Sequence, residues 1–419
     1  MKVLLIGGGG REHAIAMQIK KNPRVKHLWC APGNGGIEEI AECVNIKATD
    51  LPKIVAFCLQ NRPDLVIVAP DDPLVMGLVD ALEELGIRAF GPRAGAALIE
   101  GSKTFAKELM AAQNIPTARY AAFTDADEAI AYVEREGAPI VVKADGLALG
   151  KGVTVAMTLD EAKDAIRAAL CDHAFGEAGA RVVIEEFLTG PEVSVLCFTD
   201  GETIVPMPSA QDHKRAFDGD KGPNTGGMGA FSPSRYYTPE LAEQCMETIF
   251  RPTVDGLRQM GRRFQGVLYF GLMLTPDGPK VIEYNARFGD PETQAVLPRL
   301  KSDLLEIMEA VIDRKLEQLN VEWDDGAACC VVLASGGYPA KYETGHIIEG
   351  IHAAEALPNV TVYHAGTKQY AGGVCTAGGR VLGVTARAGT LDEAIKRAYE
   401  GAERISFPKL HKRTDIGIK

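Results

Sequence analysis

The chain has 419 residues, of which 46% are hydrophobic and 24% charged, and its formal net charge is −11. This composition predicts a globular protein of about two to four structural units, and the negative charge argues against general binding to nucleic acid or to an anionic membrane. Since no segment approaches the roughly 18 apolar residues of a membrane span and the first apolar run is too short for a signal peptide, we expect a cytoplasmic protein.

The first hundred residues alternate short apolar strands with helices. Strands are predicted from Lys2 to Ile6 and from Leu65 to Ala69, and helices from Glu12 to Lys20 and from Leu74 to Leu85. This alternation is typical of a parallel, doubly wound sheet. A nucleotide-binding type of architecture is therefore expected at this end of the chain.

A run of glycines, Gly7 to Gly10, lies between the first strand and the first helix. It does not fit the dinucleotide fingerprint, because the third glycine would fall on Glu12 or His13, and this argues against an NAD-dependent oxidoreductase. Glycines before a helix can still bring backbone N–H groups to an anion such as a phosphate ester, with Arg11 close by. The alternative is a tight turn without a ligand.

A second glycine-rich segment, Asp145 to Gly152, follows a predicted helix from Lys103 to Gln113 and a predicted strand from Ile140 to Ala144. The segment is not a Walker A motif. Lys143 on the strand could hold nucleotide phosphates while the loop closes as a lid and excludes water. The alternative is a hairpin with a charged tip.

The apolar stretch from Arg181 to Leu188 reads as a strand that breaks at Gly190-Pro191. A crossing of this kind can present backbone groups to an adenine edge, and Glu192 after it can accept hydrogen bonds from ribose hydroxyls. The alternative is a pair of surface glutamates.

The segment from Gln211 to Pro233 is too polar and too rich in glycine to be core, and it is predicted to be a long loop without secondary structure. Such loops are often functional. Its charged residues Asp212, His213, Lys214 and Arg215 could hold a zwitterion or a phosphate, and the loop alone does not decide between them.

The segment from Ile282 to Glu292, IEYNARFGDPE, is the most informative one for chemistry. Because side chains of a strand alternate between its faces, Glu283, Asn285 and Arg287 are predicted to point the same way. Glutamate and asparagine oxygens suit Mg²⁺, and arginine suits a phosphoryl or carboxylate oxygen. These residues predict phosphoryl transfer, and the alternative is a solvated edge strand.

The nine cysteines are scattered and form no CxxC pair, and two of them, Cys329 and Cys330, lie in an apolar run that reads as a strand. We expect all of them to be reduced residues of the core.

Taken together, the motifs resemble one family, the phosphoribosylamine glycine ligases or glycinamide ribonucleotide synthetases, which are ATP-grasp enzymes. The resemblance runs in order along nearly the whole chain, through GGGGREHA, APGNGG, FGP, EGSKTFAK, KADGLALGKGV, EEFL, QDHKR, GPNTGGMGAFSP, NARFGDPETQ, SGGYP, HAGT and GGRVL.

The resemblance implies an α/β (α+β) protein with an ATP-grasp fold. A Rossmann-like, doubly wound N-terminal domain would cover residues 1–100 and the ATP-grasp domain residues 101–325, with a lid subdomain at about 120–190. A C-terminal mixed α/β domain would cover residues 326–419.

The activity that the resemblance implies joins glycine to 5-phosphoribosylamine in de novo purine (IMP) biosynthesis. Glycine would attack the γ-phosphate of ATP to give glycyl phosphate and ADP, and the amine would then displace phosphate to form glycinamide ribonucleotide. ATP and Mg²⁺, or Mn²⁺, would be the cofactors. The partners would be the two small-molecule substrates, without nucleic acid or membrane, and we expect a monomer.

Matching motifs also imply the roles of single residues. Arg287 and Asp212 would be catalytic, Glu283 and Asn285 would bind the metal ion, and the remaining residues fall into two groups. ATP would contact Lys103, Lys107, Lys143, Gly150, Gly152, Glu185, Glu186, Phe187, Leu188 and Glu192. Glycine or phosphoribosylamine would contact Gly8, Gly9, Gly10, Arg11, Gly33, Asn34, Lys214, Gly226, Gly227 and Arg287.

Two departures from the family pattern limit this transfer. The strand expected at Gln265 to Leu274 lacks the further acidic metal ligand of many ATP-grasp enzymes, and Asp71 stands where the family commonly has glutamate. We assign Asp71 no role. Two rivals remain, an ATP-grasp ligase for another acid or amine and a non-catalytic ATP sensor, and the family loops and the intact metal strand argue against them.

Overall fold

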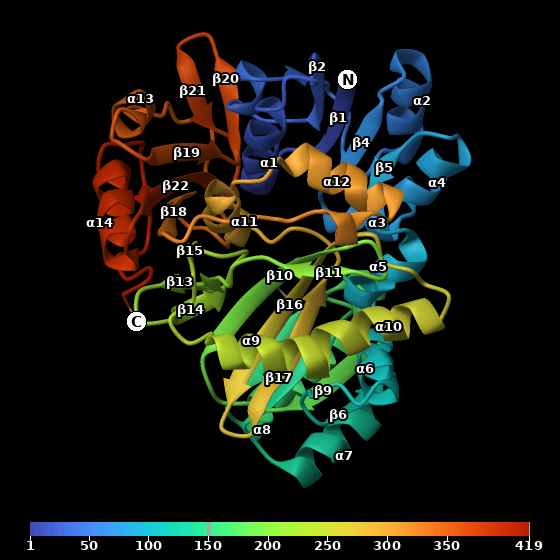
Figure 1. Ribbon diagram of the computed structural model, residues 1–419. Coiled ribbons are helices and arrows are strands. Elements are labelled where there is room, and N and C mark those ends of the chain that lie inside the picture. Colours follow the sequence, from blue (N-terminus) through green and yellow to red (C-terminus); the bar gives the residue numbers. More distant parts are fainter. Residues whose placement is uncertain (149–151, 419) are drawn as a thin grey trace.

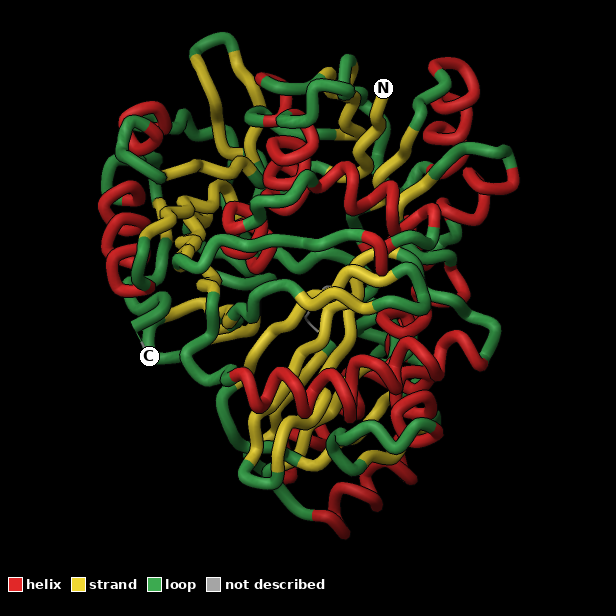
Figure 2. The backbone as a smooth tube through the Cα atoms, in the orientation of Figure 1, coloured by secondary structure: helices red, strands yellow, loops and turns green. Residues whose placement is uncertain are grey.

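A computed structural model describes residues 1–148 and 152–418 of the chain. The N-terminal and C-terminal regions lie side by side at one end of the molecule, and the middle of the chain forms the other end (Figure 1). The backbone trace shows helices around most of the strands (Figure 2). The mixed α/β class predicted from the sequence is confirmed.

The N-terminal region forms a five-stranded parallel sheet in the order β3-β2-β1-β4-β5. Its strands are β1 (Lys2–Gly7), β2 (His27–Pro32), β3 (Glu42–Cys43), β4 (Leu65–Val68) and β5 (Ala89–Phe90). Its helices are α1 (Gly10–Lys20), α2 (Leu51–Asn61), α3 (Asp71–Val75), α4 (Leu78–Glu84) and α5 (Ala94–Gly101). The parallel doubly wound sheet is therefore present as predicted.

The prediction of one continuous helix from Leu74 to Leu85 is wrong, because the structure has two helices there. Gly77 has φ +87 and lies between α3 and α4 as the cap of the second helix. A residue in this left-handed conformation ends the regular helical hydrogen bonding, and glycine adopts it without steric cost.

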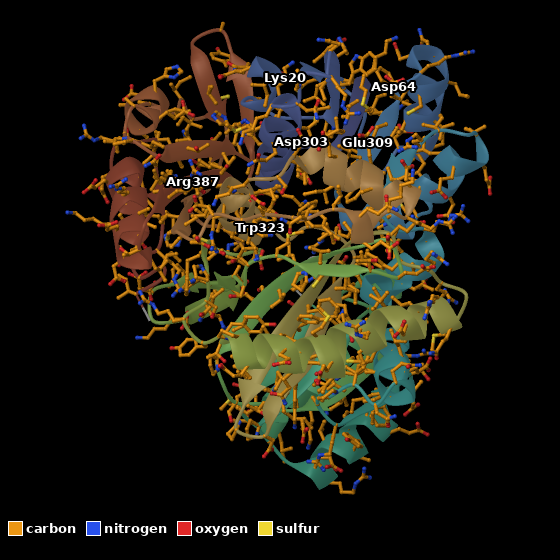
Figure 3. All side chains as sticks on the ribbon, in the orientation of Figure 1. Lys20, Asp64, Asp303, Glu309, Trp323 and Arg387 are labelled. Carbon is orange, nitrogen blue, oxygen red and sulfur yellow. The ribbon has the colours of Figure 1, made fainter. Side chains whose placement is uncertain are left out.

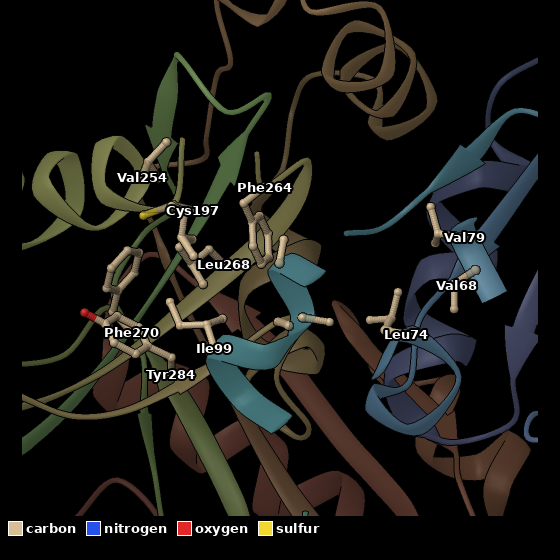
Figure 4. Close-up of a cluster of buried hydrophobic side chains, with 14 of the residues drawn as sticks. Val68, Leu74, Val79, Ile99, Cys197, Val254, Phe264, Leu268, Phe270 and Tyr284 are labelled. Carbon is tan, nitrogen blue, oxygen red and sulfur yellow. The ribbon is translucent and has the colours of Figure 1, made fainter. Parts of the chain in front are cut away.

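The centre of the molecule is an antiparallel sheet in the order β11-β10-β16-β17. Its strands are β10 (Glu192–Thr199), β11 (Ile204–Pro206), β16 (Gly266–Thr275) and β17 (Gly278–Asn285). The helices α6 (Lys103–Ala112), α9 (Pro239–Cys245) and α10 (Arg251–Gln259) belong to this region. One hydrophobic cluster runs from Val68 and Leu74 of the N-terminal region to Leu268 and Phe270 of this sheet (Figure 4). The first two regions therefore share a core.

Four strands between Tyr120 and Glu186 form a smaller sheet in the order β6-β9-β7-β8. The elements are β6 (Tyr120–Phe123), α7 (Ala126–Glu136), β7 (Ile140–Ala144), β8 (Val153–Ala156), α8 (Leu159–Leu170) and β9 (Val182–Glu186). Val142 and Ile184 of the sheet belong to one buried cluster with Val133 of α7 and Ile166 of α8, which is separate from the main core. This region therefore has a hydrophobic core of its own.

The C-terminal region contains an antiparallel sheet in the order β12-β15-β18-β22-β19, with β23 paired to β18. Its strands are β12 (Gln211–Asp212), β15 (Gly229–Ser232), β18 (Ala327–Ser335), β19 (Val360–His364), β22 (Arg380–Ala388) and β23 (Leu410–His411). Two hairpins add β13 (Arg215–Phe217) with β14 (Lys221–Asn224), and β20 (Thr367–Tyr370) with β21 (Gly373–Thr376). The helices are α13 (Ile351–Glu355) and α14 (Leu391–Ala402).

The prediction of a loop without secondary structure from Gln211 to Pro233 is wrong. The segment contains β12, β13, β14 and β15, and Phe231 is fully buried. The reason is long-range pairing, because β15 hydrogen-bonds to β18 about a hundred residues later in the sequence. The C-terminal sheet therefore takes strands from both sides of residue 325, and the domain boundary drawn there stays a prediction.

Two helices follow the central sheet in the sequence, and the first packs mainly against the C-terminal sheet and the second against the N-terminal region. They are α11 (Glu292–Val296) and α12 (Leu304–Asp313). Leu305 and Met308 of α12 join the buried cluster that holds Val3 and Leu5 of β1. The buried Asn22 donates a hydrogen bond to Asp303, the N-cap of α12, at 2.9 Å. Figure 3 labels Asp303 and Glu309, which lie beside the N-terminal region. These contacts fix the chain after β17 to the N-terminal sheet.

Two expectations from composition can be compared with the structure. The nine cysteines are all free, and Cys329 and Cys330 are buried in β18, but Cys171 is exposed, so the expectation that every cysteine belongs to the core is wrong there. Within residues 1–148 and 152–418, no helix is long and apolar enough to cross a membrane.

Candidate active site

Strand β17 brings Glu283 and Asn285 to one place, followed at its end by Arg287. Arg287 Nη2 donates to Asn285 Oδ1 at 3.1 Å, whereas Tyr284 and Ala286 between them are buried in the core. The predicted alternation of faces is thus observed. Glu283 and Asn285, two positions apart on β17, carry hard oxygen atoms of the kind that suits Mg²⁺ or Mn²⁺.

Lys214 lies between two glutamates. Its Nζ is 3.1 Å from Glu192 Oε2 and 3.1 Å from Glu283 Oε1. Burial raises the pKa of Glu283, but the positive charges of Lys214 and Lys143 outweigh it and hold that pKa below its usual range. Glu283 therefore remains a carboxylate, and the group of two carboxylates and one ammonium has a net negative charge. We call these three residues the acidic cluster.

A second group of charges has the opposite composition. Glu185 accepts from Lys107 Nζ at 3.2 Å and from Lys143 Nζ at 2.9 Å, and the three side chains are nearly fully buried. Two ammonium groups and one carboxylate carry a net positive charge. We call these residues the basic cluster.

The two clusters meet on strand β17. Lys143 Nζ donates to the carbonyl oxygen of Ile282 at 2.9 Å, and Ile282 directly precedes Glu283. The site therefore places a net positive group beside a net negative one. A polyphosphate bound to a divalent cation has the matching pattern of charge.

The glycine-rich loop is anchored beside these clusters. Lys103 Nζ donates to the carbonyl oxygen of Gly146 at 3.0 Å, and Asp145 accepts from the backbone N–H of Thr104 at 2.6 Å. Gly152 accepts from the backbone of Ala144 at 2.7 Å. Lys103 is thus directed at the loop. Gly150, predicted to contact ATP, lies outside the described residues.

The segment predicted to frame adenine follows β9. Glu186 accepts from the backbone and side chain of Arg119 at 3.0 and 2.8 Å, so its carboxylate turns away from the basic cluster, as expected for the neighbour of Glu185 in a strand. Phe187 and Leu188 are half-buried. Phe187 borders a cavity of about 260 Å³.

Arg287 is held by acidic residues from the N-terminal region. Its Nη2 is 2.8 Å from Glu100 Oε1 and 3.7 Å from Asp71 Oδ2. Burial raises the pKa of Glu100 to about 7, although the charge of Arg287 opposes the shift. Arg287 Nε is buried and has no hydrogen-bond partner among the residues that the structure describes.

Asp212 lies on β12 near the acidic cluster. Burial raises its pKa to about 8, with the attraction of Lys214 opposing this and the negative charges of Glu292, Glu192 and Glu283 adding to it. A carboxyl group with a pKa near neutrality can exchange protons with a substrate.

The predicted substrate-binding glycines lie in close-packed turns. At Gly227, where φ is +110, a Cβ atom would lie 2.4 Å from Pro291, and at Gly8 it would lie 2.4 Å from the carbonyl oxygen of Gly33. Arg380 donates to the carbonyl oxygen of Gly227 at 3.4 Å and Tyr338 Oη accepts from the backbone of Gly226. These turns bring backbone close to backbone.

The N-terminal glycine run is already occupied by protein groups. The carboxylate of Glu12 accepts from the backbone N–H of Gly9, where an anion was expected, and also pairs with Arg11 at 2.6 Å. Asn34 donates from its amide to the carbonyl oxygens of Gly8 at 3.0 Å and of His364 at 2.8 Å. Arg11, Gly9 and Asn34 therefore hold the turn together in this structure, and Gly10 begins α1 behind it.

Sequence reasoning missed several members of the site. Glu100 and Asp71 pair with Arg287, Arg380 pairs with Asp290 at 3.3 Å, and Tyr269 donates to Glu292 at 3.1 Å. Glu100, Asp290 and Glu292 lie inside motifs already noted, EGSKTFAK and NARFGDPETQ, so these motifs could have indicated that the three residues belong to the site. Their partners could not be read from local pattern.

Comparison with known families gives matches along the chain. The phosphoribosylglycinamide synthetase N domain matches residues 1–100, its ATP-grasp (A) domain residues 101–293 and its C domain residues 328–419. A phosphoribosylamine–glycine ligase of Vibrio vulnificus (strain YJ016) is 51% identical over 422 residues, which cover 100% of this chain and 98% of the relative. One of Mesorhizobium japonicum is 52% identical, with coverage of 100% and 98%.

Solved structures agree on the fold. The crystal structure of a phosphoribosylamine–glycine ligase from Thermotoga maritima has a TM-score of 0.86 and 32% identity and covers 100% of both chains. The biotin carboxylase domain of 2-oxoglutarate carboxylase from Hydrogenobacter thermophilus, solved with MgADP and bicarbonate, has a TM-score of 0.74 and covers 98% of this chain and 91% of that one. Its identity of 16% supports the fold alone.

Proposed function

Because this chain belongs to the phosphoribosylglycinamide synthetase family, we propose that it joins glycine to 5-phosphoribosylamine through a glycyl phosphate intermediate held between the basic and acidic clusters. The overall reaction is that of its full-length relatives: the chain is an ATP-dependent carbon–nitrogen ligase of purine biosynthesis. Its substrates are small molecules. The monomeric state and the cytoplasmic location stay predictions from the sequence.

The basic cluster would bind the phosphates of ATP. Lys107 and Lys143 share a single carboxylate, that of Glu185, so one positive charge is left without a counter-charge in a nearly buried place. Phosphate oxygens would neutralise it through charge-assisted hydrogen bonds. Lys103 of α6, which donates to the glycine-rich loop, would add a further contact. Phe187, Leu188 and Glu192 would frame adenine and ribose.

The acidic cluster would hold the metal ion. Glu283 and Asn285 supply two hard oxygens, and the ammonium of Lys214, 3.1 Å from Glu283, marks a place where a positive charge is already stabilised. Mg²⁺ is commonly bound by one or two protein oxygens together with substrate phosphate and water, so this small donor set fits. When bound, the ion would neutralise charge on the reacting phosphoryl group.

Arg287 would hold the glycine carboxylate and the phosphoryl group during transfer. Its guanidinium is fixed by Glu100 and Asn285, and its buried Nε has no partner among the described residues. A guanidinium held by fixed partners keeps its planar group in a defined direction. Positioning of this kind is the main contribution that a phosphoryl-transfer site makes to the rate.

The proposed reaction has two displacements. A glycine carboxylate oxygen forms a bond to the γ-phosphorus of ATP, and the bond from that phosphorus to ADP breaks. The nitrogen of 5-phosphoribosylamine then bonds to the carbonyl carbon, and phosphate leaves with the glycine oxygen. We propose that the carboxylate form of Asp212, whose pKa burial raises to about 8, accepts the proton that the amine loses.

The phosphoribosylamine site would be the region where the N-terminal turns meet the loop after β14. Gly8, Gly10 and Gly33 lie on the N-terminal side of this region, and Gly226 and Gly227 on the other, beside Asp290 and its partner Arg380. Arg11 and Asn34 would shape the N-terminal turns rather than donate directly, because their side chains already bind protein carbonyl groups.

Isotope transfer tests the intermediate directly. Glycine labelled with ¹⁸O in its carboxylate is incubated with ATP, Mg²⁺ and phosphoribosylamine formed from ammonia and ribose 5-phosphate, and the released phosphate is analysed by mass spectrometry. One ¹⁸O atom per phosphate is expected. Unlabelled phosphate together with labelled glycinamide ribonucleotide would refute the acyl phosphate.

A further inference from the structure

The segment that carries Asp212 and Lys214 has a second face, turned away from the acidic cluster. His213 points to this face, since its ring packs against Phe231 with centroids 5.9 Å apart and its Nε2 accepts from the backbone of Gly417 at 3.4 Å. Asp212 and Lys214 thus lie on the side of the acidic cluster, and His213 faces the C-terminal tail. The tail is the stretch from His411 to Gly417.

The C-terminal tail contacts residues 216–219, which follow Lys214 in the same segment, at several successive positions. His411 Nε2 lies 2.7 Å from the carbonyl oxygen of Ala216, Thr414 donates from its backbone to Asp218 at 2.8 Å, and Asp415 accepts from the backbone of Gly219 at 2.8 Å. The hairpin β13-β14 is therefore held by the end of the chain.

Arg413 is the centre of this contact, and its side chain is fully buried. It forms two parallel hydrogen bonds with Asp415, at 2.7 and 2.8 Å, and an ion pair with Asp220 at 2.9 Å. Its remaining Nη1 donates to the carbonyl oxygen of Arg215 at 3.1 Å. One guanidinium thus joins the tail, the hairpin turn and the residue that follows Lys214.

Burying the Arg413 guanidinium costs free energy, because taking a charge out of water is unfavourable, and its hydrogen-bond and ion-pair partners must offset that cost. Among the residues that the structure describes, every partner of the guanidinium lies either in the tail or in the segment from 215 to 220. Arg413 therefore fixes one segment relative to another. Its nearest consequence along the chain is the placement of Lys214.

We propose that Arg413 is a positioning residue for the ligase reaction, which holds the segment after Asp212 so that the Lys214 ammonium stays between Glu192 and Glu283. This inference rests on the proposed role of the acidic cluster. Loss of the residue would free the hairpin and disorder Lys214 without removing any group that touches ATP.

The test compares Arg413→Ala and Arg413→Lys with a control, Arg404→Ala, which removes an exposed arginine nearby in the sequence. Three readouts are made on the full chain: hydrogen exchange of the 212–220 peptide relative to α14, the kcat and KM for glycine, and the Kd for ATP alone. Lysine keeps the charge but lacks the planar fork, so Arg413→Lys is also the variant that decides the matter if Arg413→Ala does not fold.

In Arg413→Ala we expect faster exchange in 212–220 and a fall in kcat/KM for glycine of about 10–100-fold, which is the range for loss of a supporting partner, with an ATP Kd within about twofold of wild type. Arg413→Lys should lie between wild type and Arg413→Ala, and Arg404→Ala should match wild type.

Two outcomes would overturn the inference. In the first, exchange rises but glycine kinetics stay normal, so the tail holds the hairpin without any effect on catalysis. In the second, activity falls only in proportion to the folded fraction while exchange in 212–220 is unchanged. Because exchange reports on the segment itself, it separates a failure here from a failure of the role assigned to Glu283.

Discussion

The basic and acidic clusters are built from the same two residue types in inverse proportion. In the basic cluster one glutamate is shared by two lysines, and in the acidic cluster one lysine is shared by two glutamates. They differ also in exposure, since the Lys107 side chain is 3% exposed and that of Lys214 is 32% exposed. The sign of each cluster, and not its residue types, suits one to phosphate and the other to a cation.

The two lysines show what this difference does. Burial lowers the pKa of Lys107 to about 8, with Lys143 adding to the shift and Glu185 opposing it. Burial also lowers the pKa of Lys214, but the two glutamates outweigh it and raise that pKa well above its usual value. The same side chain is thus poised to lose its proton in one cluster and is fixed as an ammonium in the other.

The largest effect is expected from breaking the acidic cluster with Glu283→Gln. The amide keeps the shape of the side chain but removes the charge of the proposed metal ligand, so kcat should fall by about a thousandfold and Mn²⁺ affinity should weaken with it. Steady-state kinetics measure kcat, and Mn²⁺ titration measures the affinity for the metal ion. Glu247→Gln, on an exposed helical glutamate, is the control, and a kcat within tenfold of wild type would remove Glu283 from the metal site.

The next effect comes from the basic cluster. Lys143→Met removes one ammonium, so Lys107 and Glu185 cancel each other and the site loses its net positive charge. A charge-assisted hydrogen bond is worth about 1.5–3 kcal/mol, and the Kd for ATP should therefore rise about 10–100-fold. Isothermal titration calorimetry measures the Kd for ATP. Lys163→Met on the outer helix α8 serves as control, and an unchanged Kd would contradict the assignment of Lys143 to phosphate.

The pH dependence should separate the clusters. Since the pKa of Lys107 is lowered to about 8, its charge is lost above that pH and ATP should bind up to about tenfold more weakly at pH 9 than at pH 7. Lys107→Arg, which stays charged, should abolish this dependence. Affinity measured across pH 6.5–9.5 decides the matter, and an identical profile in both proteins would be the contrary result.

The lowered pKa of Lys107 also determines in which direction the free energy of unfolding changes with pH. Between pH 8 and 10.5 the unfolded chain keeps the Lys107 proton that the folded protein has lost, so the unfolded state binds more protons. The contribution of Lys107 to the free energy of unfolding therefore rises with pH in that window. Denaturant titrations at pH 8 and 10 should show a smaller rise in Lys107→Met.

The smallest effect is expected from Asp71→Asn. Asp71 is 3.7 Å from Arg287, whereas Glu100 is 2.8 Å from it, so the guanidinium keeps its closer partner when the Asp71 charge is removed. The KM for glycine should change by less than about threefold, since longer and more exposed pairs contribute little. Asp72→Asn is the matched control, and a tenfold rise in KM would show that Asp71 orients Arg287.

Much of the fold could be predicted because its signals are local. The strands β1, β4 and β7 were predicted to within a residue or two, since apolar runs bounded by glycine or proline specify them. The break at Gly77 and the strands between residues 211 and 232 were missed. A left-handed glycine leaves a helical pattern intact in the sequence, and β15 exists because β18 pairs with it.

The same division runs through the candidate site. The period of a strand was enough to place Glu283, Asn285 and Arg287 together, and their types were enough to suggest metal and phosphoryl oxygen. Nothing local to those residues shows that Glu100 fixes Arg287, that Lys214 lies against Glu283, or that Arg413 supports the segment beside it. These pairs join elements far apart in the chain.

By itself the sequence determined the α/β class, because that depends on short-range periodicity, and its motifs determined the family and the reaction through their resemblance to a known family. The roles of single residues stay predictions. Tertiary structure alone decided which charges share a partner. Whether Lys107 or Lys214 is poised to lose a proton depends on burial and on the charges within a few ångströms of it, and folding brings those charges together from distant parts of the chain.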